Sequence, residues 1–420
     1  MSVEVVIVGA GVAGLAAGLT LQKAGCSFVL IEAMHRIGGR ACTDADTFRT
    51  PVDLGCHWIH SPAHNPFMAL GEQYGFRVRT TPQPAVLMDG NGRLDETETE
   101  TMLAHIAHCF DTIRDVAFDA LDRTVADLFA HTGRKKEFFD VAFTNKQGVW
   151  PAEASAQDFA SYVWVGNDCP VIDGYGALVA RHARQVPVNL NTRAESIAWG
   201  NGKPAAVRTN RGQIKASAVI VTVSTGVLQA EQIRFEPGLP DWKREAIAAL
   251  PNGSCNKVTL SFRKQIFRGL ESAVVLPILG KDEAMEIVVG YEREDLATVL
   301  YNGRQAQALS AHREAAMREH AIETLATLFG DEVRREYSGT CLIADWDTEP
   351  TIRGAYSYCM PGKQRARETL ARPIASQLFF AGEAVSAKFS GDVHGAYLSG
   401  IQAARDAMAA VRKTHPPPRD

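Results

Sequence analysis

The sequence predicts an α/β fold built from two interleaved domains. Three observations predict it: a glycine-rich turn follows an apolar run at residues 5–8, strand-like runs return between residues 186 and 223, and another glycine-rich motif lies near residue 380. Segments of mixed helical and strand character separate these regions. A chain of 420 residues also exceeds the usual size of one domain. We therefore expect two discontinuous domains rather than two domains in series.

The first glycine-rich turn has the spacing of a nucleotide-binding loop. Gly9 permits a tight turn, Gly11 leaves room for a pyrophosphate, and Gly14 lets the helix expected over residues 15–24 pack against the strand. Main-chain N–H groups at the start of that helix attract phosphate. The turn therefore predicts a Rossmann-like unit that binds a dinucleotide. Its residues are Gly9, Ala10, Gly11, Val12, Ala13 and Gly14.

An acidic residue supports the same prediction. Glu32, followed by Ala33, ends a second apolar run at residues 28–31 and lies 23 positions after Gly9. A carboxylate there can accept hydrogen bonds from the ribose hydroxyls, and it would repel a 2′-phosphate. This unit alone leaves both NAD and FAD possible.

Composition excludes several classes of protein. The chain is 46% hydrophobic and 22% charged, which is typical of a globular protein, and its net charge of −4 gives no footprint for nucleic acid or an anionic membrane. The eight cysteines include no CxxC pair, which suits a reducing compartment. No apolar run approaches the ~20 residues that span a bilayer. We expect a cytoplasmic protein that begins with a strand and ends in a disordered tail at residues 415–420, and nothing in the sequence indicates its oligomeric state.

Periodicity predicts the remaining elements. Helices are expected over residues 96–109, 125–131, 305–329 and 395–411, and strands over residues 186–190, 196–199, 205–209, 219–223 and 256–262. His105, His108 and Cys109 have metal-compatible spacing on one helix, but no further ligand accompanies them. Ordinary packing is the better interpretation, and no metal site is predicted.

The order of motifs along the chain resembles the flavin-containing amine oxidases, which include monoamine oxidases, polyamine oxidases and their histone-demethylase relatives. The resemblance extends over essentially the whole length. It rests on the first glycine turn, Arg36 to Arg40 (RIGGR), Asp53 to His60 (DLGCHWIH), Asp173 to Tyr175 (DGY), Val219 to Val223 (VIVTV), Asn256 to Val258 (NKV), Gly354 to Ser357 (GAYS) and the block from Phe380 to Ala404.

The resemblance implies FAD as the cofactor and divides the chain accordingly. Residues 1–80, 170–238 and 341–420 would form the Rossmann-like FAD-binding domain, and residues 81–169 and 239–340 the mixed α+β substrate-binding domain. Gly39 and Arg40 resemble the turn and the cation that hold the pyrophosphate. Further contacts with the adenine, the ribityl chain or the flavin ring are implied for Gly55, Cys56, His57, Trp58, Ala194, Gly382, Glu383, Val393 and Ala396.

The same resemblance implies a reaction. In this family a flavin takes hydride equivalents from the carbon next to an amine nitrogen, and water hydrolyses the imine. The amine must lose its proton first, so a desolvated, aromatic-walled site is expected. Lys257 would lie against the flavin, Tyr356 would form one aromatic wall, and Trp346 would pack near the same ring. Ala355 replaces the cysteine that monoamine oxidases bond to the flavin, so the FAD is expected to be non-covalent.

Two positions bear on the substrate. Asp392 stands where the family has its second wall tyrosine, so the aromatic cage cannot form in the usual way. The carboxylate could attract a cationic substrate, could cap the final helix, or could do both. His60 is similar to the histidine at the entrance of many polyamine oxidases, where it could hydrogen-bond the amine. Together these residues favour a polyamine-like or other small amine substrate, with O2 as the expected electron acceptor.

Other functions remain as alternatives. An L-amino acid oxidase usually has a different segment where this chain has Gly55 to Trp58, and a desaturase needs a longer apolar tunnel. A flavin-bearing scaffold is disfavoured, because the chain carries no helical tower and no DNA-binding segment.

Overall fold

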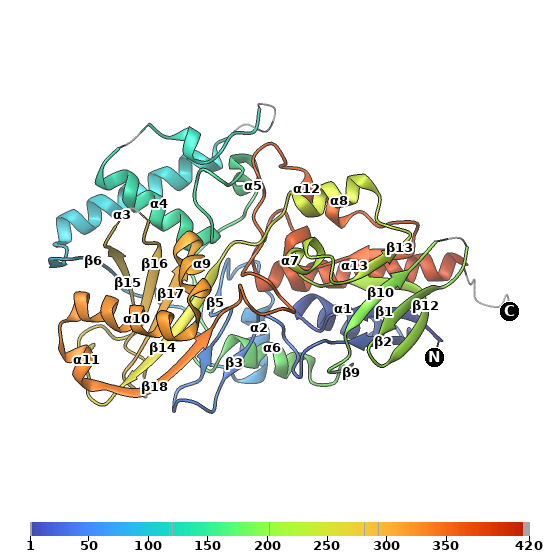
Figure 1. The fold of residues 1–420 in the computed structure, drawn as a ribbon, viewed down its shortest axis with the longest axis horizontal. Helices are drawn as coiled ribbons and strands as arrows, with labels where there is room; N and C mark the ends of the chain where they lie inside the picture. The colour runs from blue at the N-terminus through green and yellow to red at the C-terminus, as the bar shows by residue number, and fades with distance from the viewer. Residues whose placement is uncertain are drawn as a thin grey trace.

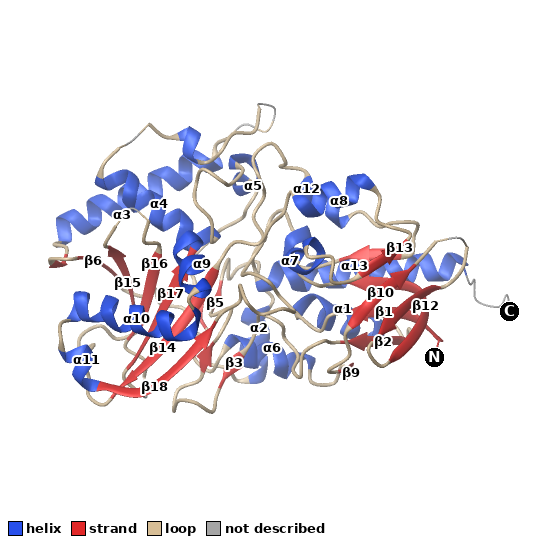
Figure 2. Ribbon diagram, in the orientation of Figure 1, coloured by secondary structure: helices blue, strands red, loops and turns tan. Residues whose placement is uncertain are grey.

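The computed structural model describes residues 2–116, 118, 121–130, 132–200, 202–280, 282–292 and 294–414. The tail for which disorder is predicted, residues 415–420, lies outside the described residues. Two large sheets lie at opposite ends of the molecule, with helices and long loops between them (Figures 1 and 2).

The first sheet has eight strands and a parallel centre. They are β1 (Ser2–Val8), β2 (Phe28–Ile31), β9 (Val188–Asn189), β10 (Ala194–Ala198), β11 (Ala205–Thr209), β12 (Gly212–Val221), β13 (Arg234–Glu236) and β19 (Leu378–Phe380). β1 pairs in parallel with β2 on one side and with β12 on the other. β19, from near the end of the chain, pairs in parallel with β12. The two ends of the sequence therefore meet in one sheet.

Helices cover both faces of this sheet. Val5 and Ile7 share one core with α1 and α13, while Val6 and Val8 share the opposite core with α8 and α12. Burial on both faces explains why β1 is a continuous apolar run rather than an alternating one. The helices beside this sheet are α1 (Val12–Lys23), α2 (Phe67–Tyr74), α6 (Tyr175–Ala183), α7 (Thr225–Gln229), α8 (Asp241–Ala248), α12 (Ala366–Ala371), the 3₁₀ turn η2 (Glu383–Val385) and α13 (Val393–Thr414).

The second sheet has seven strands, mostly antiparallel. They are β6 (Ala85–Asp89), β7 (Gly92–Arg93), β14 (Cys255–Phe262), β15 (Ala273–Ile278), β16 (Met285–Val289), β17 (Leu296–Asn302) and β18 (Tyr337–Ala344). Val258 and Leu260 of β14 enter a core with Met317 and Leu325. Lys257 is on the other face of the same strand, because successive side chains alternate. That face is turned toward the centre of the molecule.

Helices and short strands surround the second sheet and the loops. These are α3 (Glu96–Arg114), η1 (Ala126–Leu128), α4 (Arg134–Gln147), α5 (Ala156–Ala160), α9 (Gly303–Ala311), α10 (Arg313–Phe329), α11 (Glu332–Glu336), and the strand pairs β3 (Thr43–Asp44) with β4 (Val52–Asp53) and β5 (Trp58–Ile59) with β8 (Cys169–Pro170).

Two predicted helices are wrong in part. The helix expected over residues 305–329 is divided into α9 and α10, because Arg313 has a φ of +70°, which a continuous helix does not allow. The helix expected over 125–131 is only the turn η1. Thr124 and Asp127 exchange side-chain-to-main-chain hydrogen bonds of 3.1 Å, a local turn that competes with helix. His131 lies outside the described residues.

The predicted domain boundaries stay a prediction. The eight-stranded sheet draws on both ends and the middle of the chain, and the seven-stranded sheet draws on the segments between. Helix α8, which the predicted boundary assigns to the substrate-binding domain, packs into the core of the eight-stranded sheet. Within the described part of the chain, no helix combines the length and the apolarity needed to cross a membrane.

Candidate active site

One cavity of about 670 Å³ lies between the two sheets and gathers nearly all the predicted site residues. Its volume is within the range of ~300–1,000 Å³ that is usual for ligand sites. Of the residues predicted for the site, Ala10 and Gly14 of the first glycine turn do not line it. Those that do are Gly9, Gly11, Val12, Ala13, Glu32, Ala33, Gly39, Arg40, Gly55, Cys56, His57, Trp58, His60, Ala194, Lys257, Trp346, Tyr356, Gly382, Glu383, Asp392, Val393 and Ala396.

The first glycine turn joins β1 to α1 at one end of this cavity. A Cβ atom on Gly14 would lie 1.9 Å from the carbonyl oxygen of Gly9, so only glycine lets the helix start so close to the strand. A Cβ atom on Gly11 would meet no protein atom within 4 Å. Gly11 precedes α1 and caps it without a side-chain hydrogen bond. The first N–H groups of α1 therefore lie at an open part of the cavity, where an anion could bind them.

Glu32 is fixed at the same end of the cavity. Its Oε2 accepts a hydrogen bond of 2.6 Å from the Ala10 amide, and its Oε1 accepts one of 2.8 Å from the Met34 amide. A carboxylate can accept about four hydrogen bonds. The remaining acceptor sites can therefore bind ribose hydroxyls.

The segment Arg36 to Arg40 packs directly on the first glycine turn. The Gly38 amide donates to the Ala10 carbonyl at 2.8 Å, and Arg36 Nη1 donates to the Gly39 carbonyl at 2.7 Å. Gly39 has a φ of +59°, and a Cβ there would lie 3.3 Å from the Gly11 Cα. The two glycine motifs, both of which are expected to hold the pyrophosphate, thus form one continuous wall.

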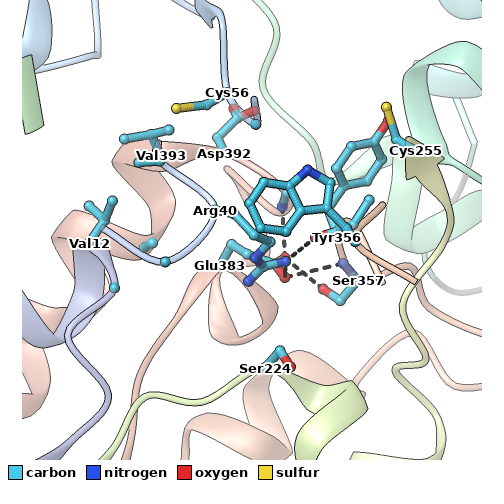
Figure 3. A pocket seen from close by; sticks show the side chains of 18 of the residues that line it. Val12, Arg40, Cys56, Ser224, Cys255, Tyr356, Ser357, Glu383, Asp392 and Val393 are labelled. Atoms are coloured by element: carbon cyan, nitrogen blue, oxygen red, sulfur yellow. Dashed lines mark hydrogen bonds and ion pairs between the residues drawn. The ribbon is translucent and has the colours of Figure 1, made fainter. Parts of the chain in front are cut away.

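Glu383 connects this wall to the far end of the chain (Figure 3). Its Oε1 lies 3.1 Å from Arg40 Nη1, and its Oε2 accepts hydrogen bonds from Ser357 Oγ at 2.7 Å and from the Gly391 amide at 2.9 Å. Burial acts to raise the pKa of Glu383, but Arg40, Arg367 and these hydrogen bonds outweigh it and hold the pKa below its ordinary value. The carboxylate therefore stays ionised, and it joins three loops at the cavity.

Lys257 and Trp346 anchor the segment that precedes Trp58. Lys257 Nζ donates to the carbonyls of Asp53 at 3.1 Å and Gly55, and Trp346 Nε1 donates to the Leu54 carbonyl at 3.1 Å. The lysine side chain is buried. The family resemblance implies that Gly55 contacts the cofactor. Packing within the protein also requires glycine at this position, because a Cβ there would lie 1.7 Å from the Arg40 carbonyl oxygen.

Aromatic side chains line the part of the cavity beyond Lys257. Tyr356 packs against Gly391, whose added Cβ would lie 3.5 Å from the tyrosine Cβ, and its hydroxyl donates to the Asn145 carbonyl at 3.3 Å. Tyr162, from the loop after α5, donates its hydroxyl to Asp392 Oδ2 at 2.9 Å. Trp164 lies two residues further along this loop and also lines the cavity. We call the part of the cavity bounded by Tyr162, Trp164 and Tyr356 the aromatic chamber.

A pair of ionisable groups lies at the wall of the aromatic chamber. His60 Nδ1 is 2.7 Å from Asp168 Oδ1, and Asp168 also accepts a hydrogen bond of 3.2 Å from Trp164 Nε1. Burial acts to lower the pKa of His60, but the charges of Asp168 and Asp392 outweigh it, so this pKa lies above its ordinary value. Lys146 Nζ lies 4.0 Å from Asp168 and 3.3 Å from the centre of the Trp164 ring. His60 and Lys146 are thus both held by the same carboxylate.

Two further carboxyl groups face the chamber. Burial raises the pKa of Glu286, on the cavity face of β16, to about 7. Burial also raises the pKa of Asp392, although His60, the Tyr162 hydroxyl and Lys146 act in the opposite direction. The Asp392 carboxylate accepts its hydrogen bond from the Tyr162 hydroxyl, and its role as a cap on α13 stays a prediction.

Sequence reasoning missed five residues of the chamber: Lys146, Tyr162, Trp164, Asp168 and Glu286. The first four lie on α4 and the loop after α5, in the segment 81–169, which was assigned to the substrate-binding domain without any site residue being predicted there. The clustering of Tyr162 and Trp164 beside Asp168 in a loop was the available signal. Glu286 interrupts an otherwise apolar strand, which is also unusual for a buried position.

The histidine and cysteine residues weighed as metal ligands form no site in the structure. Cys109 Sγ lies 3.6 Å from His105 Nε2 on α3. Among the residues that the structure describes, no three His, Cys, Asp or Glu side chains are placed to share a metal ion.

Comparison with known proteins decides the family. A sequence model of the flavin containing amine oxidoreductases matches residues 12–105 and 96–408. The chain belongs to this family. It is 28% identical to polyamine oxidase 2 of Arabidopsis thaliana, over 98% of the chain and 89% of that protein, and 27% identical to probable polyamine oxidase 4 of the same plant, over 97% and 87%. Its fold is similar to that of a putrescine oxidase bound to putrescine, with a TM-score of 0.80, 22% identity, and coverage of 97% of this chain and 99% of the other.

This flavoenzyme has FAD as its cofactor, and the residues present fit it. The unblocked helix N-terminus at Gly11 and the nearby guanidinium of Arg40 suit a pyrophosphate, and Glu32 has acceptor sites left for a ribose. Residue 355 offers only a methyl group, so the cofactor is held there without a covalent bond.

Proposed function

We propose that this flavoenzyme oxidises small aliphatic amines that carry a second cationic nitrogen, such as diamines and polyamines. The observation that carries the proposal is the set of three carboxyl groups, Asp168, Glu286 and Asp392, around the aromatic chamber. Carboxylates in a partly desolvated site attract cations strongly, because little water screens them.

The chain's residues have distinct tasks in this proposal. When bound, FAD accepts a hydride from the carbon next to the amine nitrogen, and hydrolysis of the resulting imine gives an aldehyde. Tyr356 forms a wall that orients the amine. Lys257 holds the segment from Asp53 to Gly55 in place through its two carbonyl contacts. We propose that its buried side chain also assists reoxidation, for which O2 is the proposed acceptor.

Glu286 and Asp168 are proposed to bind the second nitrogen. Glu286 has a pKa of about 7, so near neutral pH about half of it is ionised. A bound ammonium group would complete its ionisation, since an opposite charge favours the charged form. Two of the nearby cations are engaged elsewhere, Lys257 with main-chain carbonyls and Lys146 with Asp168 and Trp164. The carboxylate oxygens of Glu286 are therefore available to a substrate cation, which would share Asp168 with His60 and Lys146.

The relatives support this choice of substrate. Those reported above are named for polyamines, and the similar fold was solved with putrescine bound. At 22–28% identity they support the reaction class more strongly than any single substrate.

The test is anaerobic mixing of the purified, flavin-loaded protein with candidate amines. The visible flavin band is recorded with spermine, spermidine, putrescine, an N-acetylated polyamine, an aromatic monoamine and an L-amino acid in turn. We expect bleaching by at least one diamine or polyamine. Bleaching by the L-amino acid alone would replace the proposal with an amino acid oxidase, and a band that no amine bleaches would contradict it.

A further inference from the structure

Asp392 differs from Asp168 of the aromatic chamber, because no charged partner is in contact with it among the described residues. It immediately precedes α13, is 7% exposed, and lines the cavity next to Tyr356. Its close partner is a neutral hydroxyl, that of Tyr162, at 2.9 Å. By contrast, Asp168 has His60 at 2.7 Å and Lys146 at 4.0 Å.

The imidazole that lies within 4 Å of Asp392, that of His394, does not supply a charge either, and the charge of His60 acts on Asp392 from a greater distance. His394 Nδ1 lies 3.7 Å from Asp392 Oδ2, and it also accepts a hydrogen bond of 3.2 Å from the Asn65 side-chain amide. Burial, with smaller effects of His60 and His64, lowers the pKa of His394 to about 4. At neutral pH this histidine is uncharged. Asp392 is therefore a buried carboxylate that faces the cavity with only neutral groups in direct contact.

We infer that Asp392, supported by Tyr162, is the base that removes the proton from the substrate ammonium before oxidation. This deepens the function proposed above and rests on it. In the step, the N–H bond of the ammonium breaks, its electron pair stays on nitrogen, and the proton forms an O–H bond with the Asp392 carboxylate. The products are a neutral amine and a neutral carboxylic acid, so charge and atoms balance without another reactant.

The surroundings favour this transfer. A free ammonium beside a carboxylate in a desolvated chamber is a pair of buried charges, and proton transfer replaces it with two neutral groups. Tyr162 can keep its hydrogen bond to Asp392 in both protonation states. Its hydroxyl donates to the carboxylate and, after rotation, can accept from the carboxylic acid. Burial raises the pKa of Tyr162 well above its ordinary value, so the phenol itself stays protonated.

The other role considered for Asp392 is a cap on α13. A capping side chain accepts from an amide in the first helical turn, whereas this one accepts from Tyr162. Asparagine is as good a cap as aspartate. Asp392→Asn therefore preserves the cap and the shape of the side chain while it removes the base.

The experiment measures the pH dependence of two quantities in the flavin-loaded wild type, Asp392→Asn and Tyr162→Phe. The first is the dissociation constant of tert-butylamine, which is measured from the change that binding causes in the flavin spectrum. This amine has no hydrogen on the carbon next to nitrogen, so it binds without being oxidised. The second is the rate of anaerobic flavin reduction by putrescine. Both are recorded from pH ~6 to pH ~10, the range that ends near the ordinary pKa of an alkylamine.

For the wild type we expect tert-butylamine affinity that changes little across this range, because carboxylate and ammonium combine with no net loss of protons. For Asp392→Asn we expect affinity and reduction rate that rise about tenfold per pH unit up to pH ~10, because only the free amine is competent. In Tyr162→Phe the carboxylate remains but loses a hydrogen bond that lowers its pKa, so the acidic limb of the reduction profile moves to higher pH.

A second amine sharpens the result. A β,β,β-trifluorinated alkylamine is largely uncharged at neutral pH, since three fluorine atoms withdraw electrons from the nitrogen, and it needs no base. We expect Asp392→Asn to lower reduction by this amine at neutral pH far less than reduction by putrescine.

Other groups near Asp392 are present in the wild type and in both variants, so their titration cannot explain a difference between the pH profiles. These groups are His60, Lys146, Asp168, Tyr175, Tyr356 and His394. Affinity in Asp392→Asn that is weaker by a constant factor at every pH would overturn the inference and leave Asp392 as a simple charge. Unchanged profiles in both variants would also overturn it. Absence of flavin reduction in the wild type with every amine is a different result, because it contradicts the proposed function itself.

Discussion

The two halves of the cavity are built in different ways. The cofactor half is formed by short, contiguous motifs whose glycines and main-chain groups pack against one another, as Gly9, Gly14 and Gly39 do. The aromatic chamber takes its side chains from α4, the loop after α5, β16 and the start of α13. Close packing of glycines and main-chain groups shapes the cofactor half, whereas buried charged and aromatic side chains give the aromatic chamber its properties. The motifs that carry the family resemblance therefore lie mostly in the cofactor half, and we propose that the chamber selects the substrate.

The largest expected effect comes from the ion pair that joins these halves. Arg367 is 1% exposed, contacts Asp158 of α5 at 2.8 Å, and donates to Ser357 Oγ at 2.8 Å, which in turn contacts Glu383. Arg367→Met leaves a buried carboxylate unpaired and should lower the free energy of unfolding by ~3–5 kcal/mol. Denaturant unfolding measures this change.

The exposed pair of Arg304 and Glu153, at 2.6 Å, provides the matched control. Arg304→Met should change stability by less than ~1 kcal/mol, because water screens this pair. Equal losses in the two variants would contradict the view that the buried pair connects the two halves.

Identical substitutions at two glycines test the steric account of the cofactor half. Gly14→Ala places a Cβ 1.9 Å from the Gly9 carbonyl oxygen and should destabilise the protein by about 3 kcal/mol. Gly11→Ala meets no protein atom, so it should fold normally yet retain less FAD, since its methyl group points into open space in the cavity. Thermal denaturation and the ratio of flavin to protein absorbance distinguish the two. A Gly14→Ala variant that is fully stable and binds flavin normally would contradict the view that the close approach of Gly14 to the Gly9 carbonyl requires glycine.

Lys257→Met tests the proposed role of Lys257, which lies between the cofactor half and the aromatic chamber. The substitution leaves the carbonyls of Asp53 and Gly55 without their donor, which costs ~1–3 kcal/mol. We expect flavin reduction and reoxidation slowed by roughly 10- to 100-fold, which corresponds to the same energy. Stopped-flow absorbance measures both steps, and unchanged rates would remove Lys257 from the proposed machinery.

The smallest effect is expected at Glu286, and it depends on pH. Because the pKa of Glu286 is about 7, the group is mostly neutral below this pH and mostly ionised above it. The KM for putrescine should therefore fall as pH rises through about 7. Glu286→Gln should abolish this fall and raise KM about tenfold at higher pH, roughly the effect of one screened ion pair. The KM for butylamine, which has no second nitrogen, is the control and should change little. If the KM for putrescine depended equally on pH in the wild type and in Glu286→Gln, Glu286 would not be the residue that binds the second nitrogen.

The site residues that could be predicted from the sequence lie mostly in the cofactor half, and those that could not lie mostly in the aromatic chamber. The Gly9 turn and Glu32 could be placed at one site because each depends on local spacing, and Arg40 could be added to it through the family resemblance. Tyr162, Trp164 and Glu286 could not, because they reach the chamber only through tertiary packing of segments more than 100 residues apart in sequence. The break in the helix at Arg313 was missed for a related reason, since apolar periodicity continues through it while the backbone does not. Asp392 is intermediate: its departure from the family pattern was visible, but its partner Tyr162 was not.

The most direct test of the account compares putrescine with butylamine in the anaerobic wild type. The two amines have the same carbon chain and differ in one nitrogen, so the difference reports the carboxylates of the chamber alone. The account predicts that both bleach the flavin band and that putrescine does so at a half-saturating concentration at least ~10-fold lower, the equivalent of about 1.4 kcal/mol. Equal half-saturation by the two amines, or bleaching by neither, would contradict it.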